Sequence, residues 1–217
     1  MRVKSVGSPG CIYVLAGVNG AGKSSVLGEL ILQSGLNFFN PDVATKLIQQ
    51  QSPGLSLEQA NSRAWQEGKY RLERAIAEGR NFAFETTLGG RTITGVLGEA
   101  LVSGMQVKVW YVGLATVDLH IARVAARVGH GGHDIPEGKI RERYESSRAN
   151  LVRLAPQLTE LLVYDNSIEA DPHSGKAPQP RLLLHSMKGK IKSHAPLATF
   201  PEWAKPIFMS LRGAMKK

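Results

Sequence analysis

The sequence of 217 residues has a single cysteine, Cys11, and no long hydrophobic run. One cysteine cannot form an internal disulfide, which fits a reducing cytoplasm. No apolar run approaches the roughly 18 residues that a membrane-spanning helix needs. The basic start of the chain leads into an apolar segment but lacks a small-residue cleavage site, so we interpret that segment as a core strand and not as a signal peptide. We therefore expect a cytoplasmic protein without a membrane span.

Aromatic residues are also few, with three tryptophans, five tyrosines and six phenylalanines. Proteins that bind single-stranded nucleic acid stack bases on aromatic side chains, so this scarcity counts against that function. The formal net charge of +9 nevertheless fits nucleic acid, an anionic membrane or phosphorylated small molecules as partners. The positions of the basic residues must decide among them.

Short apolar segments alternate with segments of helical periodicity along most of the chain. This alternation predicts an α/β fold with a mostly parallel central sheet and helices on both faces. We expect five to six strands, at 11–17, 36–40, 81–87, 107–114, 160–167 and 181–187. We expect helices at 22–34, 42–50, 56–78, 91–103, 116–128, 137–154 and 201–212.

A phosphate-binding loop is the most specific motif. Residues 17–24 read GVNGAGKS and fit G-x-x-x-x-G-K-[ST] at every fixed position, between a predicted strand and a predicted helix. Lys23 is expected to reach the β- and γ-phosphates of ATP, and the Ser24 hydroxyl to ligate Mg²⁺. The motif predicts a P-loop NTPase with a three-layer sandwich. The predicted nucleotide-binding residues are Gly17, Asn19, Gly20, Ala21, Gly22, Lys23, Ser24, Ser25 and Arg123.

The rest of the sequence favours a kinase among P-loop proteins. A switch GTPase should carry N-K-x-D, which YDNS at 164–167 does not match, and the strand at 107–114 lacks the terminal acid of motor ATPases. A small-molecule kinase needs a base for the acceptor hydroxyl, an acceptor pocket and a mobile, arginine-rich lid. Each of these three has candidates in the chain.

Two carboxylates follow strands at the edge where the phosphates would bind. Asp42 comes just after the second predicted strand, and Glu85 ends the third. Either carboxylate could take a proton from an acceptor hydroxyl or hold Mg²⁺ through water. Alternatively, Asp42 caps the following helix, because Asn40-Pro41-Asp42 has good capping chemistry. The residues alone leave both interpretations of Asp42 open.

Four of the arginines on the helices predicted at 116–128 and 137–154 lie near the glycine-rich loop between the two helices. Arg123 and Arg127 share one helix face, and Arg141 and Arg143 follow beyond a glycine-rich loop. They form either a solvated basic face or a lid that supplies guanidinium groups to the migrating phosphoryl group. We expect one domain over 1–217, with a core at about 10–170, a lid at about 116–154 and a basic, largely irregular extension at 186–217.

The ordered set of motifs resembles the zeta-toxin family of P-loop kinases, most of all the chromosomal branch often labelled predicted ABC-type ATPases. The motifs, within about 10–170, are GVNGAGKS, FNPD, FETTLGGRT, the arginine-rich segment 123–151 and YDNS. The resemblance implies transfer of the ATP γ-phosphate to the sugar of UDP-N-acetylglucosamine with Mg²⁺, and an antitoxin partner by family analogy. It also implies that Asp42 is the base and that Lys23, Arg127 and Arg143, favoured over Arg141, act on the phosphates. The predicted acceptor-binding residues are Asn40, Glu85, Thr86, Thr87 and Arg91.

Two departures from the family affect the acceptor. Well-studied toxins have a glycine-acid pair where this chain has Asn40-Pro41-Asp42, and a glycine where it has Thr86. Thr86 in place of that glycine crowds the acceptor site and thereby favours a different phosphoacceptor. UDP-N-acetylglucosamine is therefore only the leading candidate among several acceptors. A nucleic-acid 5′-hydroxyl kinase or nucleic-acid-binding ATPase is the alternative, favoured by the charge and by KGKIKSH at 188–194. A third alternative is a member that binds ATP without transferring phosphate. The basic extension could dock a partner, bind an anionic surface or pack on the sheet.

Overall fold

The computed structural model describes residues 9–23, 38–129, 132, 134–168 and 179–214. The helix expected at 22–34 lies almost wholly outside these residues, as do Ser24 and Ser25 of the phosphate-binding loop. None of the described helices is long and apolar enough to cross a membrane.

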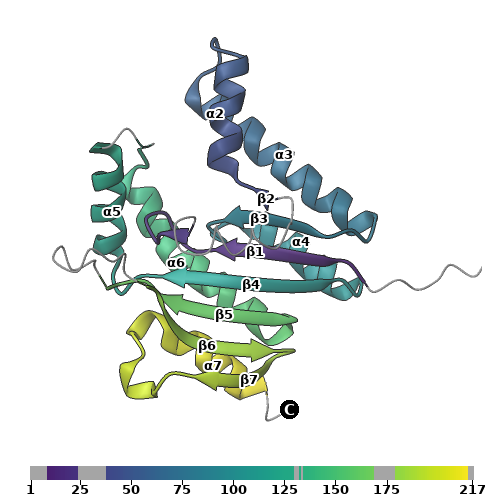
Figure 1. The fold of residues 1–217 in the computed structure, drawn as a ribbon, viewed down its shortest axis with the longest axis vertical. Coiled ribbons are helices and arrows are strands. Elements are labelled where there is room, and N and C mark those ends of the chain that lie inside the picture. The colour runs from purple at the N-terminus through teal and green to yellow at the C-terminus, as the bar shows by residue number, and fades with distance from the viewer. Residues whose placement is uncertain (1–8, 24–37, 130–131, 133, 169–178, 215–217) are drawn as a thin grey trace, which may run out of the picture.

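Among the described residues, a sheet of seven strands forms the centre of the fold, in the order β2-β3-β1-β4-β5-β6-β7 (Figure 1). The strands are β1 (Cys11–Ala16), β2 (Phe38–Phe39), β3 (Phe82–Thr86), β4 (Gln106–Gly113), β5 (Glu160–Asp165), β6 (Arg181–Met187) and β7 (Lys190–His194). The pairs among β1 to β5 are parallel, and β6 and β7 are antiparallel to their neighbours. The predicted α/β fold with a mostly parallel sheet is thereby confirmed.

The prediction of five to six strands was wrong, because β7 adds a seventh strand. A tight turn at Lys188 and Gly189, with φ of 49° and 70°, folds the chain back from β6 onto β7. Left-handed residues at both central positions give a turn whose twist matches a two-stranded hairpin. β7 itself is mostly exposed, and its lysines suit an edge strand that must not pair with other chains.

The helices are α2 (Pro41–Gln51), α3 (Leu57–Ala77), α4 (Arg91–Val102), α5 (Val117–Gly129), α6 (Glu137–Leu154) and α7 (Lys205–Ala214). The helices α4, α6 and α7 lie together on one face of the sheet (Figure 1). The pair α2–α3 rises from the β2–β3 edge, and α5 lies beyond the carboxyl ends of the parallel strands (Figure 1). The two projecting parts flank the end of the sheet where the phosphate-binding loop begins.

The C-terminal segment is part of the core, so its prediction as a largely irregular extension was wrong. Trp203, Ile207 and Leu211 are buried in the main hydrophobic cluster. The Trp203 ring lies so close to Gly113 of β4 that a Cβ atom there would come within 2.5 Å of it. Of the three roles left open for this segment, packing on the sheet is the one that the structure shows.

Candidate active site

The phosphate-binding loop is held against β4 and α5 through two glycines. Gly17 and Gly20 have φ of 141° and 81°, in the region that disfavours side chains. A Cβ at Gly17 would lie 2.2 Å from the Val112 carbonyl oxygen, and one at Gly20 would lie 2.5 Å from that of His120. The loop thus forms a tight backbone cradle that only glycine permits at these two positions.

Lys23 is buried within this cradle, with only 6% of its surface exposed. Its Nζ donates hydrogen bonds to the carbonyl oxygens of Gly17 at 2.8 Å and Val18 at 3.4 Å. The same Nζ lies 3.4 Å from Oε1 of Glu85, which ends β3. A buried ammonium group requires such partners, and they hold the charge at the mouth of the loop.

Asn40, and not Asp42, caps helix α2, so the capping interpretation of Asp42 was wrong. The Asn40 Oδ1 accepts hydrogen bonds from the backbone N–H groups of Asp42 at 2.8 Å and Val43 at 3.2 Å. The Asn40 Nδ2 group donates to Oε2 of Glu85 at 3.1 Å. Asp42 therefore occupies the exposed first turn of the helix, where its carboxylate is not used as the cap.

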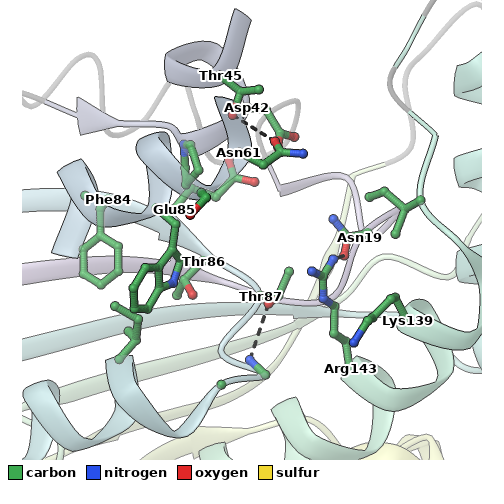
Figure 2. A pocket seen from close by; sticks show the side chains of 18 of the residues that line it. Asn19, Asp42, Thr45, Asn61, Phe84, Glu85, Thr86, Thr87, Lys139 and Arg143 are labelled. Atoms are coloured by element: carbon green, nitrogen blue, oxygen red, sulfur yellow. Dashed lines mark hydrogen bonds between the residues drawn. The ribbon is translucent and has the colours of Figure 1, made fainter. Parts of the chain in front are cut away.

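A cavity of about 830 Å³ lies between α2–α3, the end of β3 and the start of α6. Asp42 and Glu85 lie across the cavity from Asn19 and Arg143 (Figure 2). The predicted site residues that line the cavity are Asn19, Lys23, Asp42, Glu85, Thr86, Thr87 and Arg143. Residues from distant parts of the sequence therefore meet around one space.

Other predicted site residues are not brought to this cavity. Arg91 lines a separate groove of about 350 Å³ between α4 and α6. Arg123 and Arg127 lie on α5 and are not among the cavity-lining residues. Asn40 contributes through its contact with Glu85.

The backbone after β3 is strained where it borders the cavity. Leu88 is buried and has a φ of 56°, which a branched side chain rarely adopts. Ser147 Oγ donates to the Thr87 carbonyl oxygen at 2.6 Å, and Asn150 Nδ2 donates to that of Leu88 at 2.7 Å. Strain of this kind persists where surrounding contacts hold it, and it gathers at functional sites.

The zeta toxin family model matches residues 3–174, which is most of the chain. This chain belongs to the zeta toxin family. An uncharacterized protein of Haemophilus influenzae is 30% identical over 133 residues, covering 59% of this chain and 88% of that protein. Family membership confirms the predicted resemblance and makes the chain a kinase, a phosphotransferase.

Two solved structures show the same fold at low sequence identity. A chain of the AvrRxo1-ORF1:ORF2 complex with ATP has a TM-score of 0.62 and 13% identity, over 96% of this chain and 77% of that one. A chain of the PezAT chromosomal toxin–antitoxin system of Streptococcus pneumoniae has a TM-score of 0.59 and 15% identity, over 98% and 86%. Both alignments include the C-terminal part that lies beyond residue 174.

Arg141 and Arg143 of α6 have different surroundings in this zeta toxin family member. Arg141 is exposed and pairs with Asp118 at 3.0 Å and Glu137 at 3.9 Å. Arg143 lines the cavity, and its Nη1 donates to Oδ1 of Asn19 in the phosphate-binding loop at 2.8 Å. Burial lowers the pKa of the Arg143 guanidinium from its ordinary value.

Two further residues that hold the loop had not been predicted from the sequence. His120 is only 1% exposed, and its Nδ1 lies 2.8 Å from the carbonyl oxygen of Asn19. Burial lowers the pKa of His120 to about 4, so the ring is neutral and its Nδ1–H donates to that oxygen. Asn166 Nδ2 donates to the Ala21 carbonyl oxygen at 2.9 Å. Asn166 lies in YDNS, a segment that contributes to the family resemblance but in which the sequence assigns no role to Asn166.

Proposed function

We propose that the protein is an ATP-dependent kinase that transfers the γ-phosphate to a hydroxyl of a nucleotide sugar such as UDP-N-acetylglucosamine. The observation that carries the proposal is that Lys23, Asp42 and Arg143 line one cavity. These residues supply an ammonium group, a carboxylate and a guanidinium group, the set that phosphoryl transfer to a hydroxyl requires. The volume of about 830 Å³ suits an acceptor larger than a single sugar.

The phosphate-binding loop fits a nucleoside triphosphate. Its backbone is packed closely against neighbouring carbonyl oxygens at Gly17 and Gly20, and a glycine-rich loop of this sequence binds phosphate through its backbone N–H groups. ATP supplies the phosphoryl group, and Mg²⁺ neutralises part of the charge on its oxygens. We assign the Mg²⁺ ligand to Ser24 from the motif, and Ser25 and Arg123 to the nucleotide.

In this proposal Asp42 accepts the proton of the acceptor hydroxyl. Asn40 caps α2 and also contacts Glu85, so the helix start and the acceptor strand are fixed to each other. Thr86 and Thr87 border the acceptor, while Lys23 and Arg143 act on the phosphates. The family resemblance also assigns Arg127 to the phosphates, and this residue lies on α5 outside the lining of the cavity. Arg91 lines the other groove, and we leave it out of the acceptor site.

A protein partner and a cellular location complete the proposal. The similar structure from Streptococcus pneumoniae belongs to a toxin–antitoxin system, so we propose that an antitoxin protein binds this chain. The use of ATP and a single, buried cysteine suit a cytoplasmic protein.

The test is to incubate the purified protein with Mg²⁺ and ATP and a panel of acceptors, and to identify products by mass spectrometry. The panel contains UDP-sugars, free nucleosides and a 5′-hydroxyl oligonucleotide, with Asp42→Asn as the control. One phosphate added to a UDP-sugar, and lost in the variant, supports the proposal. Phosphate on the oligonucleotide would favour the nucleic-acid kinase instead, and ADP release without a phosphorylated acceptor would leave the acceptor assignment without support.

Nucleotide binding is measured separately by titration calorimetry. Lys23→Ala should remove most ATP binding, because Lys23 supplies the charge at the mouth of the loop. Unchanged ATP affinity in this variant would contradict the assignment of the loop.

A further inference from the structure

Asn19 lies where the phosphate-binding loop meets both lid helices. Its side-chain oxygen accepts a hydrogen bond from Arg143 of α6 at 2.8 Å. Its backbone carbonyl oxygen accepts one from His120 of α5 at 2.8 Å. Asn19 also lines the cavity that holds Lys23 and Asp42. One residue of the loop is therefore the common partner of two helices that reach it from elsewhere in the sequence.

The partner of Arg143 differs in charge from the partners of Arg141. Arg141 contacts two carboxylates, Asp118 and Glu137, which offset its charge at the protein surface. Asn19 offers a neutral amide oxygen, so the hydrogen bond holds the guanidinium group and leaves its positive charge intact. A guanidinium group has five N–H donors in a fixed plane, so others remain to face a phosphate.

The stem of Arg143 is fixed as well as its head. The Arg143 Cγ lies against Gly89, where an added Cβ would come within 3.2 Å of it. Gly89 belongs to the loop after β3. Ser147, which lies on α6 together with Arg143, donates a hydrogen bond to the backbone of this loop at Thr87. Arg143 thus passes from the acceptor side of the cavity to the nucleotide side, with Asn19 at its far end.

The position of Asn19 is itself held by His120. The buried, neutral ring donates from Nδ1 to the Asn19 carbonyl oxygen, and Gly20 packs against the His120 backbone. The ring also packs edge-on against Tyr144, which follows Arg143 in the chain, with centroids 5.6 Å apart. The amide that receives Arg143 is therefore attached to a rigid part of the molecule.

We propose that Asn19 is a positioning residue that holds the Arg143 guanidinium group, with its charge intact, in the cavity where the phosphoryl group is transferred. The inference rests on the proposed kinase function. If Asn19 has this role, catalysis requires an uncharged side chain at position 19. This requirement is separate from nucleotide binding, which the loop backbone performs. A group aligned before the reaction stabilises the transition state without having to be ordered during it.

The first test is a double-mutant cycle with Asn19→Ala, Arg143→Ala and the double variant, measured as kcat and KM for ATP. Arg143→Ala should lower kcat at least about 100-fold, the scale for losing one preorganised charged donor. Asn19→Ala should lower kcat about tenfold, with KM for ATP changed less than about threefold, since only the alignment is lost. The double variant should match Arg143→Ala within about twofold, because residues that act as one unit are not additive.

Asn19→Asp separates charge from hydrogen bonding. The carboxylate can accept the same bond but offsets the guanidinium charge and repels phosphate, so kcat should fall further than in Asn19→Ala. Arg141→Ala is the matched control and should keep kcat within about twofold. Two outcomes would overturn the proposal. One is a loss of kcat in the double variant equal to the product of the two single losses, and the other is a kcat of Asn19→Asp equal to that of the wild type.

A second measurement does not need turnover. In the nucleotide-free protein, the guanidinium NMR signal of Arg143, assigned by its loss in Arg143→Lys, should be distinct from those of exposed arginines. In Asn19→Ala it should move to the exposed range while the Arg141 signal stays in place. An unmoved Arg143 signal would refute the inference. If no acceptor is phosphorylated by the wild type, the proposed function fails, yet this signal still decides the role of Asn19.

Discussion

The carboxyl edge of the sheet and the C-terminal segment use burial in opposite ways. At the edge, Lys23 is buried among carbonyl oxygens and Leu88 holds a strained backbone. In the C-terminal segment, Trp203 is buried among apolar neighbours, while the lysines of β7 face solvent. Buried charge and backbone strain in the first region lower the free energy of unfolding, and apolar packing in the second region raises it. Changes in the two regions should therefore affect different measurements.

The largest effect on stability is expected from Trp203→Ala. The ring is 2% exposed, so its loss should lower the free energy of unfolding by about 3–5 kcal/mol, as measured by urea denaturation. Trp65→Ala is the matched variant, because Trp65 is 46% exposed and lines the cavity. It should change stability by less than about 1 kcal/mol and raise KM for the acceptor instead. If Trp203→Ala and Trp65→Ala lowered the free energy of unfolding equally, the proposed difference between the two regions would be wrong.

The next largest effect is a pH dependence that comes from His120. Burial, together with the nearby cations Lys23, Arg123 and Arg148, lowers the pKa of His120 from 6.5 to about 4. The hydrogen bond to the Asn19 carbonyl oxygen acts in the opposite direction but does not offset burial. The unfolded chain takes up a proton on this ring near pH 6.5, and the folded protein does so only near pH 4. The unfolded state therefore binds more protons within that window, so stability falls as the pH is lowered through it.

This difference between the two pKa values corresponds to about 3 kcal/mol lost between pH 6.5 and pH 4. The measurement is urea unfolding at both pH values for the wild type and for His120→Asn, whose amide can donate to the same carbonyl. The variant should lose about 3 kcal/mol less than the wild type over this window. The same pH dependence in both proteins would show that His120 is not held neutral.

Local patterns were enough to predict most of the elements. The helix expected at 56–78 corresponds to α3, and Ser56 and Gln59 form a capping box at its start. β7 was missed because KIKSH has one apolar residue among polar ones, so its periodicity gives no signal. Only the turn before it could have indicated a hairpin.

The site was harder to predict than the fold, because its contacts join distant segments. Glu85 was predicted as a site residue from its place at the end of a strand, but its contacts with Lys23 and Asn40 were not predicted. Asn166 contacts Ala21 across 145 residues, and nothing local to either residue points to the other. The roles of the site residues stay predictions that the experiments must test.

A smaller loss is expected from Asp42→Asn, which keeps the shape of the cavity and removes the carboxylate. Turnover should fall at least about 100-fold, close to 2.7 kcal/mol, while ATP affinity is retained. Asp118→Asn is the matched control, because this carboxylate pairs with Arg141 at the surface. Full activity of Asp42→Asn in the phosphorylation assay would rule out its role as the base.

The smallest effect compares the caps of α2 and α3. Asn40→Ala and Ser56→Ala each remove a helix cap and should lower stability by about 1 kcal/mol. Asn40 also donates to Glu85, whereas the described hydrogen bonds of the Ser56 side chain go only to Gln59. Asn40→Ala should therefore also raise KM for the acceptor several-fold, and Ser56→Ala should leave kinetics unchanged. If the two variants have the same kinetics, Asn40 is a cap alone, and the acceptor strand is positioned without it.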